Sequence, residues 1–240
     1  MKLSVVIPVY NEARHIEDVL SRMETADACG FEKEIIVVDD GSTDGTTKIL
    51  QGFRIRDGYR IIRHPFNQGK GAALKTAFSA AQGEYILIQD ADEEYNPADW
   101  PALLAPIIEK RAEVVFGSRM LIQNNVPVSR IYFYGGILIS KIFNALFGTS
   151  FTDIATGYKV FPRRCVLPLL YSASNDFVFD IVELTYVLSR SALLAEVPIR
   201  YRARSRREGK KLDWRHGLKC LAAMGEIKLG LRRFSQAEKS

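Results

Sequence analysis

Asp90 and Asp92 stand one residue apart at the end of the apolar run Tyr85-Ile86-Leu87-Ile88. The run has the length and composition of a buried strand, and an open α/β sheet binds its ligands beyond the carboxyl ends of its strands. Two carboxylates at this spacing can jointly hold Mg²⁺, which prefers one or two such ligands together with phosphate oxygens. The pattern therefore indicates a site for a divalent cation and a diphosphate. The alternative is a solvated acidic turn.

Positive charge is concentrated in residues 200–219, which hold six arginines and three lysines against one Glu and one Asp. The whole chain has a net charge of only +5. Such a segment is expected to meet phosphate on a nucleotide, a nucleic acid or an anionic membrane. A solvated charged loop is the alternative.

Alternating strand and helix patterns position these charges. Apolar runs predict strands at residues 3–9, 34–38, 59–63, 84–89 and 113–117. Helical spacing predicts helices at 11–23, from the turn at 39–45 through Leu50, at 70–81 and at 97–110. This alternation predicts parallel βαβ units in one sheet.

The composition is that of a single globular domain over residues 1–240, with 47% hydrophobic and 25% charged residues. The three cysteines lack CxxC spacing, so we expect neither disulfides nor structural zinc, and a reducing cytoplasm fits. Residues 1–10 read as a first strand, because Pro8 interrupts the run and no cleavage site follows.

Two amphipathic segments, 131–147 and 214–234, follow Ser118. A spanning helix needs about 20 predominantly apolar residues, and polar residues interrupt both segments. Together with the basic segment they predict peripheral contact with a membrane, and ordinary core helices are the alternative.

Other sites for phosphate or nucleophilic chemistry are missing from the sequence. His64 stands where a Walker A loop needs glycine, and neither GxGxxG after the first strand nor GxSxG occurs. Histidines 15, 64 and 216 are isolated, so we interpret each as a surface or packing residue.

Four motifs occur in order: VVIPVYNE (residues 5–12), IVVDDGSTD (36–44), NQGKG (67–71) and QDAD (89–92). Together they resemble the family 2 glycosyltransferases of the GT-A fold. Later segments, FGSR (116–119), DIATGYK (153–159) and EVPI (196–199), resemble the dolichyl-phosphate mannose synthase branch. The resemblance implies a Rossmann-like, mostly parallel twisted sheet flanked by helices. Residues 1–117 would be a nucleotide-sugar-binding half, and 118–240 an acceptor half with the two amphipathic helices.

The resemblance also assigns roles to residues. Donor-binding positions would be Pro8, Tyr10, Glu12, Val38, Asp40, Lys70, Gln89, Asp90, Ala91, Asp92, Arg204 and Lys210. Mg²⁺ or Mn²⁺ would be held by Asp90, Asp92 and Glu94, although many relatives carry another polar residue at the third position. Arg119 would contact the donor phosphate or the acceptor phosphate, and Arg130 the acceptor phosphate. The catalytic set would be Asp90, Asp92 and Arg119.

The chemistry of sugar transfer suits these residues. Negative charge develops on the leaving nucleoside diphosphate, and a divalent cation with Arg or Lys stabilises it. A lipid monophosphate, with a second pKa near 6, is largely ionised at pH 7 and needs no general base. Toward a hydroxyl acceptor, Asp153 or Asp180 could be the base.

We therefore expect a metal-dependent inverting glycosyltransferase that moves mannose from GDP-mannose onto a polyprenyl or dolichyl phosphate. It would lie peripherally at the cytoplasmic face of a membrane, alone or with an anchoring subunit. The same fold could use UDP-glucose, another nucleotide sugar or a saccharide acceptor, or could be a non-catalytic nucleotide-sugar or lipid-binding module. A nucleic-acid partner is not expected, because no stacking aromatics are interleaved with the basic residues.

Overall fold

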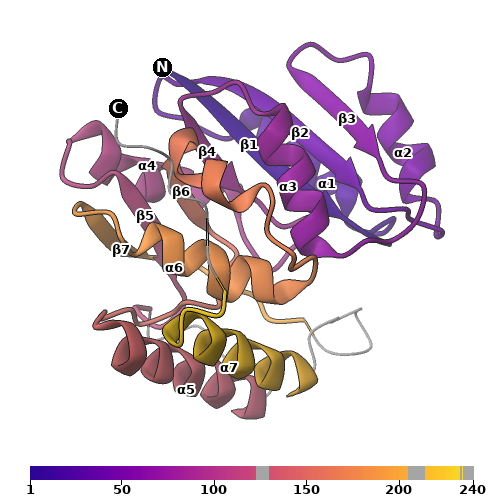
Figure 1. Ribbon diagram of the computed structural model, residues 1–240. Helices are drawn as coiled ribbons and strands as arrows, with labels where there is room; N and C mark the ends of the chain where they lie inside the picture. Colours follow the sequence, from indigo (N-terminus) through magenta and orange to yellow (C-terminus); the bar gives the residue numbers. More distant parts are fainter. Residues whose placement is uncertain (123–129, 205–213, 233, 235–240) are drawn as a thin grey trace.

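The protein is described by a computed structural model that covers residues 1–122, 130–204, 214–232 and 234, with the side chains of 130–132 excepted. Its centre is a seven-stranded sheet in the order β3-β2-β1-β4-β6-β5-β7 (Figure 1). Every neighbouring pair is parallel except those made by β6, which runs antiparallel to both β4 and β5. The predicted α/β class with a mostly parallel sheet is confirmed.

The strands are β1 (Lys2–Val9), β2 (Glu32–Asp39), β3 (Tyr59–Arg63), β4 (Tyr85–Ile88), β5 (Val114–Ser118), β6 (Lys159–Pro162) and β7 (Leu194–Pro198). The α-helices are α1 (Ile16–Thr25), α2 (Thr46–Phe53), α3 (Lys70–Ala80), α4 (Trp100–Ile108), α5 (Arg130–Phe147), α6 (Thr185–Leu188) and α7 (Trp214–Lys228). Short 3₁₀ segments cover Pro97–Asp99 and Arg163–Leu169, and a π-helix covers Phe179–Leu184.

Three predicted helix boundaries are wrong. The first helix begins at Ile16 instead of residue 11, because Asn11 has a positive φ of 52° and binds the 42–43 turn, its amide donating to Ser42 Oγ at 2.9 Å. The helix predicted at 97–110 begins as a 3₁₀ turn and ends at Ile108. The helix predicted to reach 234 ends at Lys228. Gly230 adopts φ 72° there, and its amide donates to the carbonyl oxygen of Ile227 at 3.1 Å, which ends the helix.

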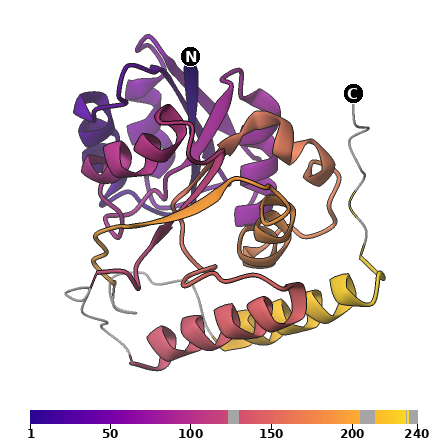
Figure 2. The same ribbon diagram turned by 90° about the vertical axis from the view of Figure 1, so that its left-hand side faces the viewer.

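The sheet separates two cores, as expected when side chains alternate between its faces. One core contains α3, the π-helix and the inner faces of α5 and α7, and the other contains α1 and α4. Helices α5 and α7 lie side by side and form an outer layer at one end of the molecule, packed against the first of these cores (Figure 2). Phe143 and Met224 are buried beneath them, whereas Tyr134 and Trp214 are more than half exposed. Across the described part of the chain, no helix combines the length and apolarity needed to span a bilayer.

Strands from both predicted halves build the sheet. The division after residue 117 passes through the end of β5, whose two neighbours, β6 and β7, both come from the second half. The assignment of donor and acceptor halves stays a prediction.

Candidate active site

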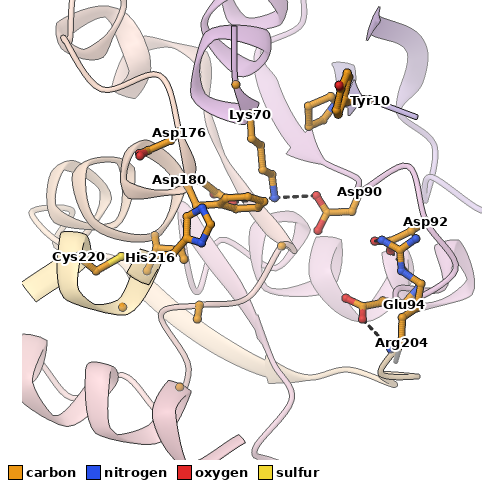
Figure 3. A pocket seen from close by; sticks show the side chains of 18 of the residues that line it. Tyr10, Lys70, Asp90, Asp92, Glu94, Asp176, Asp180, Arg204, His216 and Cys220 are labelled. Atoms are coloured by element: carbon orange, nitrogen blue, oxygen red, sulfur yellow. Dashed lines mark hydrogen bonds and ion pairs between the residues drawn. The ribbon is translucent and has the colours of Figure 1, made fainter. Parts of the chain in front are cut away.

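A cavity of about 720 Å³ opens where β1, β2 and β4 end (Figure 3). Its wall includes Pro8 from β1, Asp40 after β2 and Asp90 after β4. The antiparallel β6 brings its beginning to the same edge of the sheet, so Gly157 also lines the cavity. The cavity continues to α5 and α7, where its wall becomes apolar.

Lys70, the first residue of α3, extends into this cavity. Its Nζ lies 2.8 Å from Asp90 Oδ1 and 2.9 Å from Asp180 Oδ2 (Figure 3). Burial lowers the pKa of Lys70, but the charges of Asp180 and Asp90 more than offset this and raise it above its usual range. Lys70 therefore remains an ammonium group at the end of β4.

The glycines on either side of Lys70 explain the NQGKG motif. A Cβ at position 69 would lie 2.3 Å from the carbonyl oxygen of Asn175, and one at position 71 would lie 2.6 Å from Phe179 Cβ. Only glycine at these two positions lets the start of α3 approach residues 175–179 so closely. The approach brings Lys70 within reach of Asp180.

Asp180 lies between two lysines. Its Oδ1 accepts from Lys159 Nζ at 2.8 Å, and the same ammonium donates to the carbonyl of Thr156 at 2.7 Å. Burial raises the pKa of Asp180, but Lys159 and Lys70 outweigh it, so the net shift is downward. With both oxygens engaged by cations, Asp180 is a poor general base.

Arg204 holds the other end of the acidic cluster. Its guanidinium donates to Glu12 Oε2 at 2.9 Å and also binds Asp92, while its backbone amide donates to Glu94 Oε1 at 2.7 Å (Figure 3). Burial, followed by the charges of Asp90 and Glu94, raises the pKa of Asp92 to about 7, against the opposing effect of Arg204.

The three predicted metal ligands, Asp90, Asp92 and Glu94, each contact a donor of this chain. Among the described residues no group of three His, Cys, Asp or Glu side chains is arranged to hold a metal. The first two carboxylates nevertheless face the cavity as hard oxygen donors, each beside a side-chain cation, and this donor set fits Mg²⁺ or Mn²⁺. The ligand roles stay predictions.

Arg119, directly after β5, forms a two-bond ion pair with buried Asp153. Nε and Nη2 donate to Oδ2 and Oδ1 at 2.6 and 2.7 Å. Burial lowers the pKa of Arg119, but Asp153 more than offsets this and raises it well above its ordinary value. Asp153 therefore serves as a counter-ion, and a fixed guanidinium lines the cavity.

The predicted nucleotide-contacting residues divide into two groups. Pro8, Tyr10, Glu12, Asp40 and Ala91 line the cavity. Val38 lies in the core, and Gln89 is buried, its Oε1 accepting from Trp100 Nε1 at 3.1 Å and from the Tyr158 hydroxyl at 2.7 Å. A donor contact by these last two stays a prediction.

Two predicted phosphate contacts cannot be placed. Arg130 begins α5, but its side chain lies outside the described residues, as does the whole of Lys210.

Two residues behind the cavity wall, which contact its carboxylates, were not predicted as part of the site. His64, interpreted from the sequence as a surface or packing residue, is 8% exposed and its Nδ1 lies 2.7 Å from Asp40 Oδ1. The carboxylate of Asp40 also accepts from the amides of Gln68 and Gly69 at 3.0 and 2.7 Å. The sequence signal that could have identified Lys159 is the DIATGYK segment, in which it is the last residue.

The far end of the cavity is formed by α5 and α7. Its wall there includes Gly135, Gly136, Leu138, Ile139, Trp214, Gly217, Leu218 and Leu221. Leu138, Trp214 and Leu218 are also 57%, 64% and 56% exposed, so apolar surface continues from the cavity to the outside of the protein.

Comparison with known proteins gives consistent relatives. The sequence model described as "Glycosyl transferase family 2" matches residues 4–164. The chain is 30% identical over 207 residues to an uncharacterized protein of Methanocaldococcus jannaschii, with 83% of this chain and 81% of that protein covered.

Relatives that are named for an activity include the following two enzymes. The dolichyl-phosphate beta-glucosyltransferase of Saccharomyces cerevisiae is 30% identical over 224 residues, covering 82% of this chain and 66% of that enzyme. The dolichol-phosphate mannosyltransferase of Pyrococcus furiosus is 27% identical over 214 residues, covering 88% and 59%. The chain thus spans only about two thirds or less of these enzymes.

Among solved structures, the fold is similar to glucosyl-3-phosphoglycerate synthase from Mycobacterium tuberculosis, crystallised with Mn²⁺, UDP and phosphoglyceric acid. The TM-score is 0.71 at 20% identity, with 95% of this chain and 78% of that chain covered.

Proposed function

The chain belongs to glycosyl transferase family 2, and from this premise we propose that it transfers a sugar from a nucleotide sugar to a polyprenyl phosphate at a membrane surface. One observation carries the proposal: a single cavity joins the Lys70–Asp90–Asp92 region to an apolar end between α5 and α7. A diphosphate and a lipid can therefore meet in one space.

The donor diphosphate would lie against Lys70, Arg119 and Arg204, which line the cavity from three different segments. Asp90 and Asp92 would hold Mg²⁺ or Mn²⁺ beside it. When bound there, the cation would supply Lewis-acid stabilisation of the charge on the leaving diphosphate. Lys70 can donate its ammonium hydrogens to phosphate oxygens while it remains on Asp180.

The acceptor is inferred to be a phosphate rather than a hydroxyl. Asp153 and Asp180, the two carboxylates considered as bases, are both bound to cations. A phosphate monoester is already ionised near neutral pH and needs no proton removed. Its oxygen forms the new bond to the anomeric carbon as the bond to the diphosphate breaks, with inversion.

The prenyl chain would leave the cavity between α5 and α7. Trp214, Leu218 and Leu138 continue the apolar wall to the exposed face, where interfacial helices bury their apolar sides in lipid headgroups. Relatives whose names specify dolichyl phosphate support this assignment. A membrane-anchoring subunit stays a prediction.

GDP-mannose is the proposed donor, and the mannosyltransferase relative supports it. UDP-glucose is the second candidate, favoured by the beta-glucosyltransferase relatives from yeast and Drosophila melanogaster at 30% and 29% identity.

The test is transfer of radiolabel from GDP-mannose and from UDP-glucose to a polyprenyl phosphate in detergent, with Mn²⁺, Mg²⁺ or EDTA. Label in the lipid phase that requires the metal is the expected result, and the labelled donor identifies the nucleotide. Equal label in the lipid phase in the presence of EDTA would contradict the metal requirement. If neither donor labels the lipid but an added saccharide becomes labelled, the acceptor is a saccharide instead of a polyprenyl phosphate.

A further inference from the structure

Lys159 is a lysine with a completely buried side chain at the beginning of β6. Its Nζ lies 2.8 Å from Asp180 Oδ1 and 2.7 Å from the carbonyl of Thr156, and it faces the ring of Phe116 at 5.7 Å. It does not line the cavity. Burying an isolated charge costs free energy, so a lysine in this position needs a counter-charge and is expected to have a functional role.

The partner is shared. Asp180 binds Lys159 through Oδ1 and Lys70 through Oδ2, so two ammonium groups divide one carboxylate. The trio therefore has one positive charge in excess. Lys70 is its only member that also contacts Asp90, where the donor diphosphate is proposed to bind.

We propose that Lys159 is a positioning residue for donor binding, which acts through Asp180 on Lys70. By occupying Oδ1, Lys159 leaves Oδ2 to Lys70 and fixes the ammonium of Lys70 in the cavity. By neutralising Asp180, it leaves Asp90 as the counter-charge of Lys70, and Asp90 is the carboxylate that the cation of the diphosphate would engage. This inference rests on the proposed function, since it concerns the diphosphate of the same donor.

The architecture supports this assignment. Because β6 lies between β4 and β5 and runs antiparallel to both, its first residue stands at the edge where β4 ends. The ammonium group of Lys159 therefore lies inside the protein, behind the cavity wall, where solvent screens its charge little.

The experiment compares the unaltered 240-residue chain with Lys159→Met and with the double variant Lys159→Met/Asp180→Asn. Titration calorimetry with Mn²⁺ present gives the Kd of UDP and GDP, and of uridine and guanosine, which lack phosphate. In Lys159→Met, Asp180 becomes a second unneutralised negative charge beside Lys70, so we expect diphosphate binding to weaken at least about tenfold. Nucleoside binding should not change.

The double variant decides between charge and structure. It removes Lys159 and the charge of Asp180 together, so the additional negative charge beside Lys70 is gone and most of the lost diphosphate affinity should return. A purely structural role predicts the opposite, because the double variant is the more heavily altered. Lys159→Gln, which can keep a hydrogen bond without the charge, replaces Lys159→Met if that variant does not fold.

Lys75→Met is the matched control. Lys75 lies on α3, donates to the carbonyl of Ser172 at 2.6 Å and to Asn175 Oδ1 at 2.7 Å, and does not line the cavity. Its loss should leave diphosphate affinity unchanged.

Three results would overturn the inference: unchanged diphosphate affinity in Lys159→Met, an equal loss of nucleoside affinity, or no recovery in a folded double variant. A wild type that binds neither UDP nor GDP with Mn²⁺ would instead overturn the proposed function, and this inference with it.

Discussion

Substitution of Gly157 by alanine tests whether the position of Asp90 matters for transfer. A Cβ at this position would lie 2.3 Å from Asp90 Oδ2 and 2.9 Å from Tyr95 Cε2. A carbon–oxygen contact is ordinarily about 3.3 Å or longer, so the carboxylate has to move by about 1 Å. Oδ1 of the same carboxylate is held by Lys70 at 2.8 Å, so the movement also disturbs that ion pair.

Stability and activity should respond unequally. The least costly relief is a shift of the Asp90 side chain, so the expected loss of stability is that of modest overpacking, about 1–3 kcal/mol. Transfer should fall further, because a misplacement of about 1 Å at a reacting centre can cost roughly a hundredfold in rate. The free energy of unfolding comes from urea titration, and the transfer rate from the radiolabel assay.

Gly52→Ala is the matched glycine control. Gly52 lies on α2, far from the cavity wall, and a Cβ there would meet nothing within 4 Å. Alanine should stabilise this helix by about 0.5–1 kcal/mol without changing transfer. A Gly157→Ala enzyme with wild-type transfer would refute the reasoning. So would a loss of transfer no larger than the unfolded fraction explains.

Four further outcomes are expected. Asp92→Ala should lower kcat at least roughly a hundredfold while the protein stays folded by circular dichroism, and normal turnover would remove the metal from the mechanism. Because the pKa of Asp92 is raised to about 7, Mn²⁺ affinity measured by calorimetry should rise from about pH 6 to about pH 8 as the carboxyl loses its proton, and a flat profile would contradict this. By the same shift the native state binds a proton that the unfolded chain has released, so the metal-free protein should lose stability from about pH 4 to about pH 7 in thermal melts. Leu218→Asp should weaken binding to anionic vesicles roughly tenfold in sedimentation, whereas Ile55→Asp, at a 90% exposed position between α2 and β3, should not; equal effects would argue against docking through α7.

The sequence predicted the first five strands because each is a compact apolar run followed by turn residues. The same runs located Asp40 and Asp90 at strand ends, and strand ends gather at one edge of a parallel sheet. Strands β6 and β7 were missed; β6 pairs with β4 and β5 and β7 with β5, and local apolar patterns do not reveal such pairings between distant segments. Glu196 accepts from the amides of Thr152 and Asp153, a long-range contact that local patterns do not reveal.

The charged partners in the site were harder to predict than its members. Lys70 and Arg119 were identified by motif, but their ion pairs with Asp180 and Asp153 depend on where β6 and the π-helix pack. Asp180 and Asp153 therefore looked like possible bases in the sequence, whereas the structure shows both as counter-ions.

The antiparallel strand β6 also has a consequence for unfolding. It comes from the second half of the chain and lies between β4 and β5. Without it the sheet would be divided into two pieces. Pairings between segments so distant in sequence form slowly, and once formed they tie the two regions together. The two parts of the sheet are therefore expected to melt in one cooperative transition, and a destabilising substitution in α5 or α7 should lower the melting temperature of the cavity-lining strand ends as well.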